Sequence, residues 1–110
     1  MTVATAAQWV EGARPRTLPA AIAPVAVGAG LAANVDSFVA LRVLLALIVS
    51  IALQVGVNYA NDYSDGIKGT DKARVGPIRL VGQELAPASH VRLAAFAAFG
   101  VAAVSGLILV

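Results

Sequence analysis

The residues best suited to chemistry form a short stretch of acids and amides directly after a long apolar run. Asn58, Asn61, Asp62, Asp65 and Asp71 place three carboxylates and two carboxamides within about four helical turns. If a helix continues past the apolar run, the first four share one face, because their offsets of three, four and seven residues are those of helical neighbours. Carboxylates this close repel one another unless a divalent cation lies among them, and oxygen ligands suit Mg²⁺. The sequence therefore predicts a magnesium site with Asn61, Asp62, Asp65 and Asp71 as candidate ligands.

Basic residues follow the acids, namely Lys68, Lys72, Arg74 and Arg79. An acidic cluster with a basic tail, at the mouth of an apolar bundle, suits a metal-bound phosphate ester that carries an apolar chain. The alternative is a solvated polar turn, because turns rich in Asp and Asn are common after membrane helices. In the first interpretation, the residues expected to take the catalytic roles are Asn61, Asp62 and Asp65.

The composition is that of an integral membrane protein. Of the 110 residues, 59% are hydrophobic and 13% are charged, whereas a soluble domain of this length needs far more polar surface. The absence of Cys excludes disulfides and thiolate metal sites, and the lone His90 cannot form a cluster of His ligands. A formal charge of +2 is too small and too dispersed to indicate a nucleic-acid partner.

Three apolar segments predict an all-α fold, a multi-pass transmembrane helical bundle. Trp9 and the nearby Arg residues are typical of a chain that lies at the membrane surface before it enters the bilayer. A signal peptide is the alternative for the first segment, but a long polar region precedes that segment and two further spans follow. The predicted elements are an interfacial helix over about 4–13, spans over about 17–33, 41–58 and 91–110, and a polar loop over 59–88.

The basic residues indicate an orientation in the membrane. Arg14 and Arg16 precede the first span, and most other basic residues lie in or just after the long loop, whereas the short turn is followed only by Arg42. Cytoplasmic loops carry an excess of Lys and Arg. We therefore expect a cell-membrane protein whose N-terminus and motif loop are cytoplasmic.

These motifs resemble the UbiA superfamily of membrane prenyltransferases, and most closely its 1,4-dihydroxy-2-naphthoate polyprenyltransferase branch. Asn61–Asp65 is similar to the first aspartate-rich motif of the superfamily, and the wider stretch Asn58–Arg79 resembles that branch. Arg14–Pro19 and Pro24–Gly28 resemble its first helix. The resemblance covers roughly residues 9–90.

One position departs from the pattern of the superfamily. A further Asp often stands four residues after the position of Asp65, where this chain has Gly69, and Asp71 is the nearest acid. The resemblance also implies about nine membrane helices and a second aspartate-rich motif. Because the chain ends within an apolar run, Leu107–Val110, we expect it to be the N-terminal part of a longer protein.

The resemblance implies a Mg²⁺-dependent prenyltransferase. Its substrates would be a polyprenyl diphosphate and 1,4-dihydroxy-2-naphthoate, which loses its carboxyl group to give demethylmenaquinol. Neutralising the diphosphate makes it a better leaving group, and an apolar bundle keeps water away from the allylic cation. The residues expected to contact substrate are Arg14, Asn58, Tyr63, Lys68, Lys72 and Arg79; for Arg14 the role follows from the resemblance.

Two other functions remain open. One is a UbiA-like prenyltransferase with another acceptor, of the 4-hydroxybenzoate or haem type, since no spacing in this sequence identifies the acceptor. The other is a cation-coupled transporter, although the acids lie at the end of a span and not at its middle. Three of the residues expected to contact substrate could instead have an ordinary role in the membrane. Arg14 would be an interfacial anchor, Tyr63 would belong to the interfacial aromatic belt, and Arg79 would be an ordinary positive-inside residue.

Overall fold

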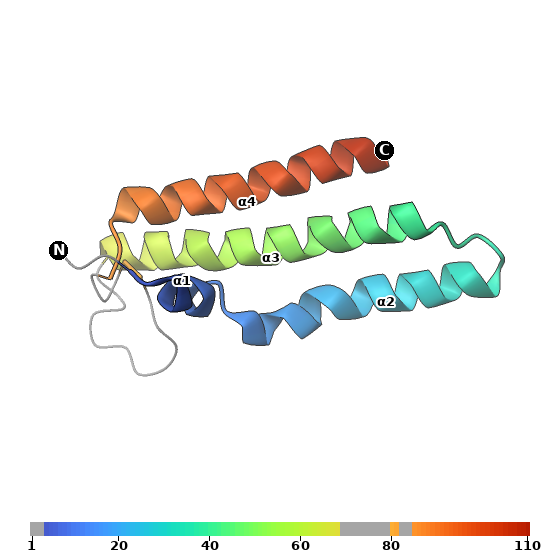
Figure 1. The fold of residues 1–110 in the computed structure, drawn as a ribbon, viewed down its shortest axis with the longest axis horizontal. Coiled ribbons are helices and arrows are strands. Elements are labelled where there is room, and N and C mark those ends of the chain that lie inside the picture. The colour runs from blue at the N-terminus through green and yellow to red at the C-terminus, as the bar shows by residue number, and fades with distance from the viewer. Residues whose placement is uncertain (1–3, 69–79, 82–84) are drawn as a thin grey trace.

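The computed structural model describes residues 4–68, 80–81 and 85–110, and the regular structure in those ranges is entirely helical. α2, α3 and α4 lie side by side with α3 in the middle, and α1 lies beside the C-terminal end of α3 (Figure 1). The predicted all-α fold is therefore confirmed. The elements are α1 (Ala6–Gly12), the 3₁₀ helix η1 (Pro15–Thr17), α2 (Leu18–Asn34), α3 (Ala40–Lys68) and α4 (Ala88–Leu109).

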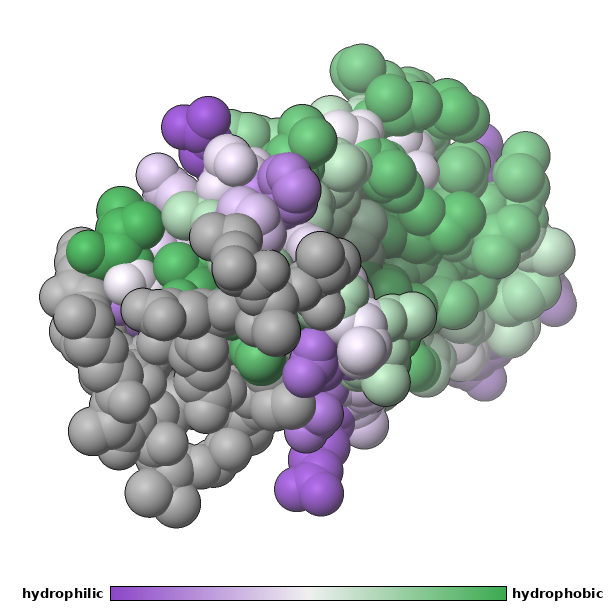
Figure 2. All heavy atoms as spheres, turned by 60° about the vertical axis from the view of Figure 1, so that its left-hand side comes forward, coloured by the Kyte–Doolittle hydropathy of each residue, from purple (hydrophilic) through white to green (hydrophobic). Residues whose placement is uncertain are grey.

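Within the described residues, three helical stretches are long and apolar enough to cross a membrane, as the sequence predicts. Their outer surfaces are apolar: Leu31, Leu93 and Leu107 are 65%, 67% and 78% exposed. Figure 2 shows that apolar side chains dominate the surface over much of the helices. An exterior of this kind suits lipid chains or neighbouring helices and not water. The three stretches are Ala6–Asn34, Ala40–Ile67 and Ala88–Leu109.

α3 is longer than the span predicted for it. Its 29 residues form a rod of roughly 44 Å, whereas the hydrocarbon core of a bilayer is about 30 Å thick. The apolar residues 40–57 cover most of that thickness, so the polar end from Asn58 to Lys68 reaches the membrane surface. The prediction that the loop begins at residue 59 is therefore wrong, because no Pro interrupts this end of the helix and the single Gly66 weakens it by only about 1 kcal/mol.

α4 packs closely along α3, and Gly56 permits the approach. A Cβ atom added at Gly56 would lie 2.7 Å from Cε1 of Phe99 on α4, which is closer than real contacts allow. α4 begins at Ala88, earlier than predicted, because Pro87 is the extended residue that precedes it. At the motif end, a small core joins α3 and α4 to Leu80 and Val81; its buried members are Tyr59, Leu80, Ala86, Val91 and Ala95.

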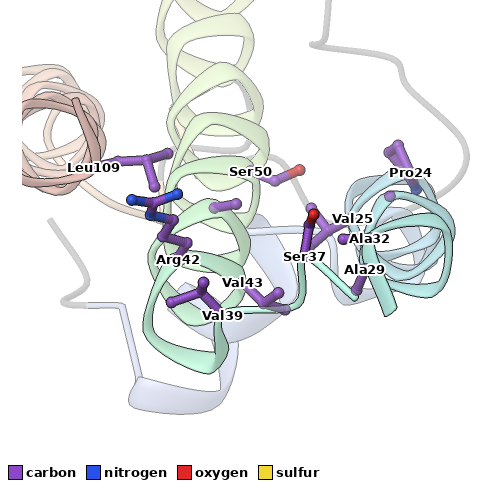
Figure 3. A pocket seen from close by; sticks show the side chains of 12 residues that line it. Pro24, Val25, Ala29, Ala32, Ser37, Val39, Arg42, Val43, Ser50 and Leu109 are labelled. Atoms are coloured by element: carbon purple, nitrogen blue, oxygen red, sulfur yellow. The ribbon is translucent and has the colours of Figure 1, made fainter. Parts of the chain in front are cut away.

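An open apolar groove of about 580 Å³ lies between α2 and α3, toward the end away from the polar motif (Figure 3). Ser50 joins the two helices there, since its Oγ donates to the carbonyl oxygen of Ala21 at 2.7 Å. Among the described residues that line the groove, Arg42 is the one charged side chain. The groove and the acidic motif therefore belong to opposite ends of α3.

Candidate active site

Four side chains of the polar motif fall into two rows along the end of α3. Asn58 and Asp62 are 3% and 0% exposed, whereas Asn61 is exposed and Asp65 is half-buried. Residues four apart lie one above the other on a helix, so Asn58 and Asp62 form an inner row, and Asn61 and Asp65 form an outer row. The spacing predicts one polar face on this helix, and the structure divides that face into a buried row and a more exposed row.

Asp62, in the inner row, binds the backbone at Leu80 and Val81. The N–H of Leu80 donates to Oδ2 at 2.7 Å, and the N–H of Val81 donates to Oδ1 at 2.8 Å. Hydrogen bonds to a charged acceptor are about twice as strong as neutral ones, and they offset the cost of burying this carboxylate. Asp62 therefore holds Leu80 and Val81 against α3. Sequence reasoning missed this contact, because Asp62 and Leu80 are 18 residues apart.

Asn58, the other member of the inner row, binds the N-terminal segment. Its Nδ2 donates to the carbonyl oxygen of Ala13 at 2.8 Å and to Oγ1 of Thr17 at 3.0 Å. Next to it, Oη of Tyr59 donates to the carbonyl oxygen of Trp9 at 2.6 Å, and the two rings meet edge to face at a centroid distance of 5.6 Å. α1 and η1 are thus tied to the end of α3 by side chains of α3.

Arg14 lies in the turn between α1 and η1, and its backbone is left-handed, with φ 59° and ψ 67°. A positive φ is unusual for Arg, and the Pro15 that follows disfavours helical conformations at this position. Strain of this kind costs about 1–3 kcal/mol and persists only where the surroundings impose it. The carbonyl oxygen of Arg14 accepts from both Oγ1 (2.7 Å) and N (3.0 Å) of Thr17. Arg14 as a residue is half-buried.

The outer row, Asn61 and Asp65, offers oxygen donors one helical turn apart at the polar end of α3. Donors of this type fit Mg²⁺, which typically takes one or two carboxylates and completes its shell with water and phosphate oxygens. Among the described residues, no three His, Asp or Glu side chains gather as a metal-binding group. The predicted ligand Asp71 lies outside the described residues. The magnesium site, including the role of Asp62 in it, stays a prediction.

The remaining substrate-contact predictions can be placed only in part. Lys68 is the last residue of α3, and Tyr63 is half-buried and packs against the core cluster at the motif end. Arg14 and Asn58 lie at the same end of the bundle, because Asn58 binds the carbonyl oxygen of Ala13, the residue before Arg14. The structure thus brings four of the six predicted residues to one end; the other two, Lys72 and Arg79, lie outside the described residues.

Comparison with known proteins gives close matches to one group of curated enzymes. The chain is 58% identical over 107 residues to the 1,4-dihydroxy-2-naphthoate octaprenyltransferase of Mycobacterium tuberculosis, which covers 97% of this chain and 37% of that protein. Its counterpart in Mycobacterium leprae is 57% identical over 97% of this chain and 36% of its own length. The Escherichia coli enzyme of the same name is 41% identical over 93% of this chain and 33% of its own length.

Neither a family model nor a solved structure matches the chain. The chain spans about one third of the length of the curated relatives it matches. Identity at this level over nearly the whole chain establishes homology, and it confirms the resemblance that the motifs indicate. The chain therefore belongs to the 1,4-dihydroxy-2-naphthoate polyprenyltransferase family.

Proposed function

We propose that the whole protein carrying this chain transfers a polyprenyl group from a polyprenyl diphosphate to 1,4-dihydroxy-2-naphthoate. The acceptor loses its carboxyl group in the reaction, and the product is demethylmenaquinol. The names of the relatives support the acceptor and the type of transfer. Because the chain spans about a third of those relatives, the proposal concerns the whole protein.

The observation that carries the proposal is the position of the outer row at the polar end of an otherwise apolar bundle. Asn61 and Asp65 would hold Mg²⁺ there, and the ion would offset the charge of the diphosphate as a Lewis acid. The apolar helices extend from this point into the bilayer. A substrate with a charged head and a long apolar chain fits this arrangement, since the head would lie at the motif and the chain along the helices.

The protein's own cations would share the charge of the diphosphate. Arg14 and Lys68 belong to the same end of the bundle as the outer row. Guanidinium and ammonium groups stabilise the negative charge that develops on a leaving phosphate, and they act most strongly where water is excluded. Arg14 and Lys68 would therefore bind and orient the diphosphate, together with Lys72 and Arg79.

We propose that this end of the bundle faces the cytoplasm from the cell membrane. The basic residues before α2, and those that follow α3, support this orientation by the positive-inside rule. The α2–α3 turn, with Arg42 just after it, would then lie on the other side.

The test is an assay of the whole protein in membranes with a polyprenyl diphosphate, 1,4-dihydroxy-2-naphthoate and Mg²⁺. We expect prenylated, decarboxylated product, and none after removal of Mg²⁺ with EDTA. A parallel assay with 4-hydroxybenzoate addresses the alternative acceptor. Product from 4-hydroxybenzoate alone would overturn the proposed acceptor, and no product from either would overturn prenyl transfer.

A cation-coupled transporter is less well supported. A transported ion is bound near the middle of the membrane by unwound helices. In the described part of this chain, the Asp and Asn side chains of the motif lie at the end of α3, which is helical throughout its length.

A further inference from the structure

We propose that Asn58 and Thr17 are positioning residues that hold Arg14 in a strained conformation and so present its guanidinium to an oxyanion of a substrate. The inference rests on the proposed function, because it takes the two substrates from there. The geometry around Arg14 supports it through three observations: backbone strain, the hydrogen bonds that impose that strain, and a cation with no protein partner among the described residues.

The first observation is that Arg14 and Asp36 are the two described residues other than Gly with a positive φ. Asp36 lies in an exposed turn, and a short polar side chain such as Asp tolerates this region. Arg14 has no such advantage, and Pro15 follows it. Strained residues that persist tend to cluster at binding and catalytic sites, which makes Arg14 the position to explain.

The second observation is that both peptide planes of Arg14 are fixed by hydrogen bonds. Asn58 holds the plane before Arg14 through the carbonyl oxygen of Ala13 (2.8 Å). Thr17 holds the plane after Arg14 through that residue's own carbonyl oxygen (2.7 Å from Oγ1). Since φ and ψ are the rotations between these two planes, this pair of side-chain contacts restrains the conformation of Arg14, in addition to the backbone hydrogen bonds from Arg14 N to the carbonyl oxygen of Glu11 and from Thr17 N to the carbonyl oxygen of Arg14 (both 3.0 Å).

The same contacts link the Thr17 hydroxyl to α3. Nδ2 of Asn58 donates to Oγ1 of Thr17 at 3.0 Å, so the hydroxyl accepts from Asn58 and its own hydrogen is directed to the carbonyl oxygen of Arg14. Asn58 lies three residues before Asn61, which is about one helical turn. The outer row and Arg14 are thus positioned from the same end of the same helix.

The third observation concerns the guanidinium of Arg14. Arg14 is half-buried as a residue, and within the described part of the chain its guanidinium makes no hydrogen bond or ion pair. A guanidinium binds phosphate and carboxylate groups through two parallel hydrogen bonds. The two substrates offer one group of each kind, the diphosphate of the prenyl donor and the carboxylate of the acceptor. The shared chemistry is an oxyanion, and the experiment distinguishes its two sources.

The test compares Thr17→Val with Thr17→Ser in the whole protein, with kcat and the KM for each substrate as readouts. Val keeps the size of Thr but cannot donate a hydrogen bond to the carbonyl oxygen of Arg14. We expect the KM for one substrate to rise about tenfold, because the charged hydrogen bond between Arg14 and that substrate is weakened. The KM for the other substrate should change less than about twofold. Ser restores the hydroxyl and should restore the raised KM. A selective rise identifies the diphosphate or the carboxylate as the group bound.

The matched control is Thr5→Val, which removes a hydroxyl that caps α1 through the N–H of Gln8. It should lower thermal stability without changing either KM. If Thr17→Val behaves like Thr5→Val, or raises both KM values equally, the hydroxyl of Thr17 has only a structural role and the inference is overturned.

A double-mutant cycle tests whether Thr17 acts through Arg14. In an Arg14→Ala background, we expect Thr17→Val to change the affected KM by less than about twofold, because the group that it positions is gone. Fully additive effects would overturn the inference even when wild-type turnover supports the proposed function. Equilibrium binding of each substrate gives the same comparison without turnover, and a wild-type protein that neither binds nor converts either substrate would overturn the proposed function itself.

Discussion

Asp62 and Asp65 stand three residues apart on α3, and their surroundings suggest different roles. Asp62 is fully buried with both carboxylate oxygens bonded to backbone N–H groups. Asp65 is half-buried, close to the end of the helix. At the scale of single residues, the inner row is suited to hold the surrounding segments in place, and the outer row is suited to bind metal and substrate.

The first prediction is that Asp65→Asn lowers the turnover of the whole protein by at least about a hundredfold. Loss of one preorganised electrostatic contact commonly costs a factor of about 10² to 10³ in rate. Asn keeps the size of Asp and one oxygen, so folding should be unaffected. Turnover is measured against Mg²⁺ concentration, and a higher concentration should partly restore it.

Asp36→Asn, in the exposed α2–α3 turn, is the control for this change. Asn tolerates a positive φ as well as Asp does, so the control should be nearly neutral. If Asp65→Asn resembles it, Asp65 is a solvated acid and the proposed metal site is wrong.

The second prediction is that Asp62→Asn lowers the free energy of unfolding by about 1–3 kcal/mol. The amide keeps one acceptor oxygen for the N–H groups of Leu80 and Val81, so one buried donor is left unsatisfied. Asp62→Ala leaves both donors unsatisfied and should cost more. Thermal or denaturant unfolding in detergent measures the effect.

The comparison for Asp62 is Asp65→Asn, which should change stability much less. A stable Asp62→Asn protein whose turnover falls as far as that of Asp65→Asn would show that Asp62 acts in the chemistry, as the sequence interpretation has it.

At the scale of elements, α3 is the helix on which the others are assembled. α2 and α4 pack along its two sides, and α1 is attached to its polar end (Figure 1). The approach of α4 depends on Gly56, because the ring of Phe99 occupies the place of a side chain. Small residues allow such close packing between membrane helices, where dispersion contacts and not water drive association.

The third prediction is that Gly56→Ala destabilises the protein by about 1–3 kcal/mol, the usual cost of overpacking. The new Cβ would lie 2.7 Å from Cε1 of Phe99 and 2.8 Å from Cδ1, so the ring or the helix must move. Gly100→Ala on α4 is the matched control, since a Cβ there meets nothing within 4 Å. It should be neutral or slightly stabilising. Equal effects of the two changes would contradict the packing described for α3 and α4.

At the scale of the whole molecule, the polar groups are divided between the two ends of the bundle. The acidic motif, α1 and the start of α4 lie at one end, and the α2–α3 turn with Arg42 lies at the other (Figure 1). The apolar groove belongs to the second end. The proposed orientation places the first end in the cytoplasm, where the diphosphate and the carboxylate of the two proposed substrates would be accessible.

The fourth prediction tests this orientation with single cysteines in a cysteine-free whole protein. Ser37 and Ser89 are both exposed, and they lie at opposite ends of the bundle. In intact cells, a membrane-impermeant thiol reagent should label Ser37→Cys, and it should label Ser89→Cys only after the cells are opened. The reverse pattern would show that the motif faces outward.

The sequence alone predicts three long apolar helices and the all-α class, which the described part of the structure confirms, and it predicts that the chemistry lies at the polar end of α3. These properties depend on the hydropathy of short stretches of sequence. The hydropathy of about twenty consecutive residues decides whether a helix can lie in lipid, and a polar motif between two such stretches is expected at the membrane surface. The sequence predicts the helix boundaries less well. Its polar composition predicts a loop from residue 59, whereas α3 continues to Lys68, because polar residues do not by themselves end a helix that lacks Pro.

Only the tertiary structure decides which motif residues bind the protein's own backbone. Asn58 meets Ala13 from 45 residues away, and Asp62 meets Leu80 from 18 residues away. The spacing of residues along one helix cannot identify such partners. It tells which side of the helix a side chain is on, but it does not tell which other segment of the chain packs against that side. The strained turn at Arg14 has the same origin, because local preferences before Pro15 oppose it and contacts from α3 impose it.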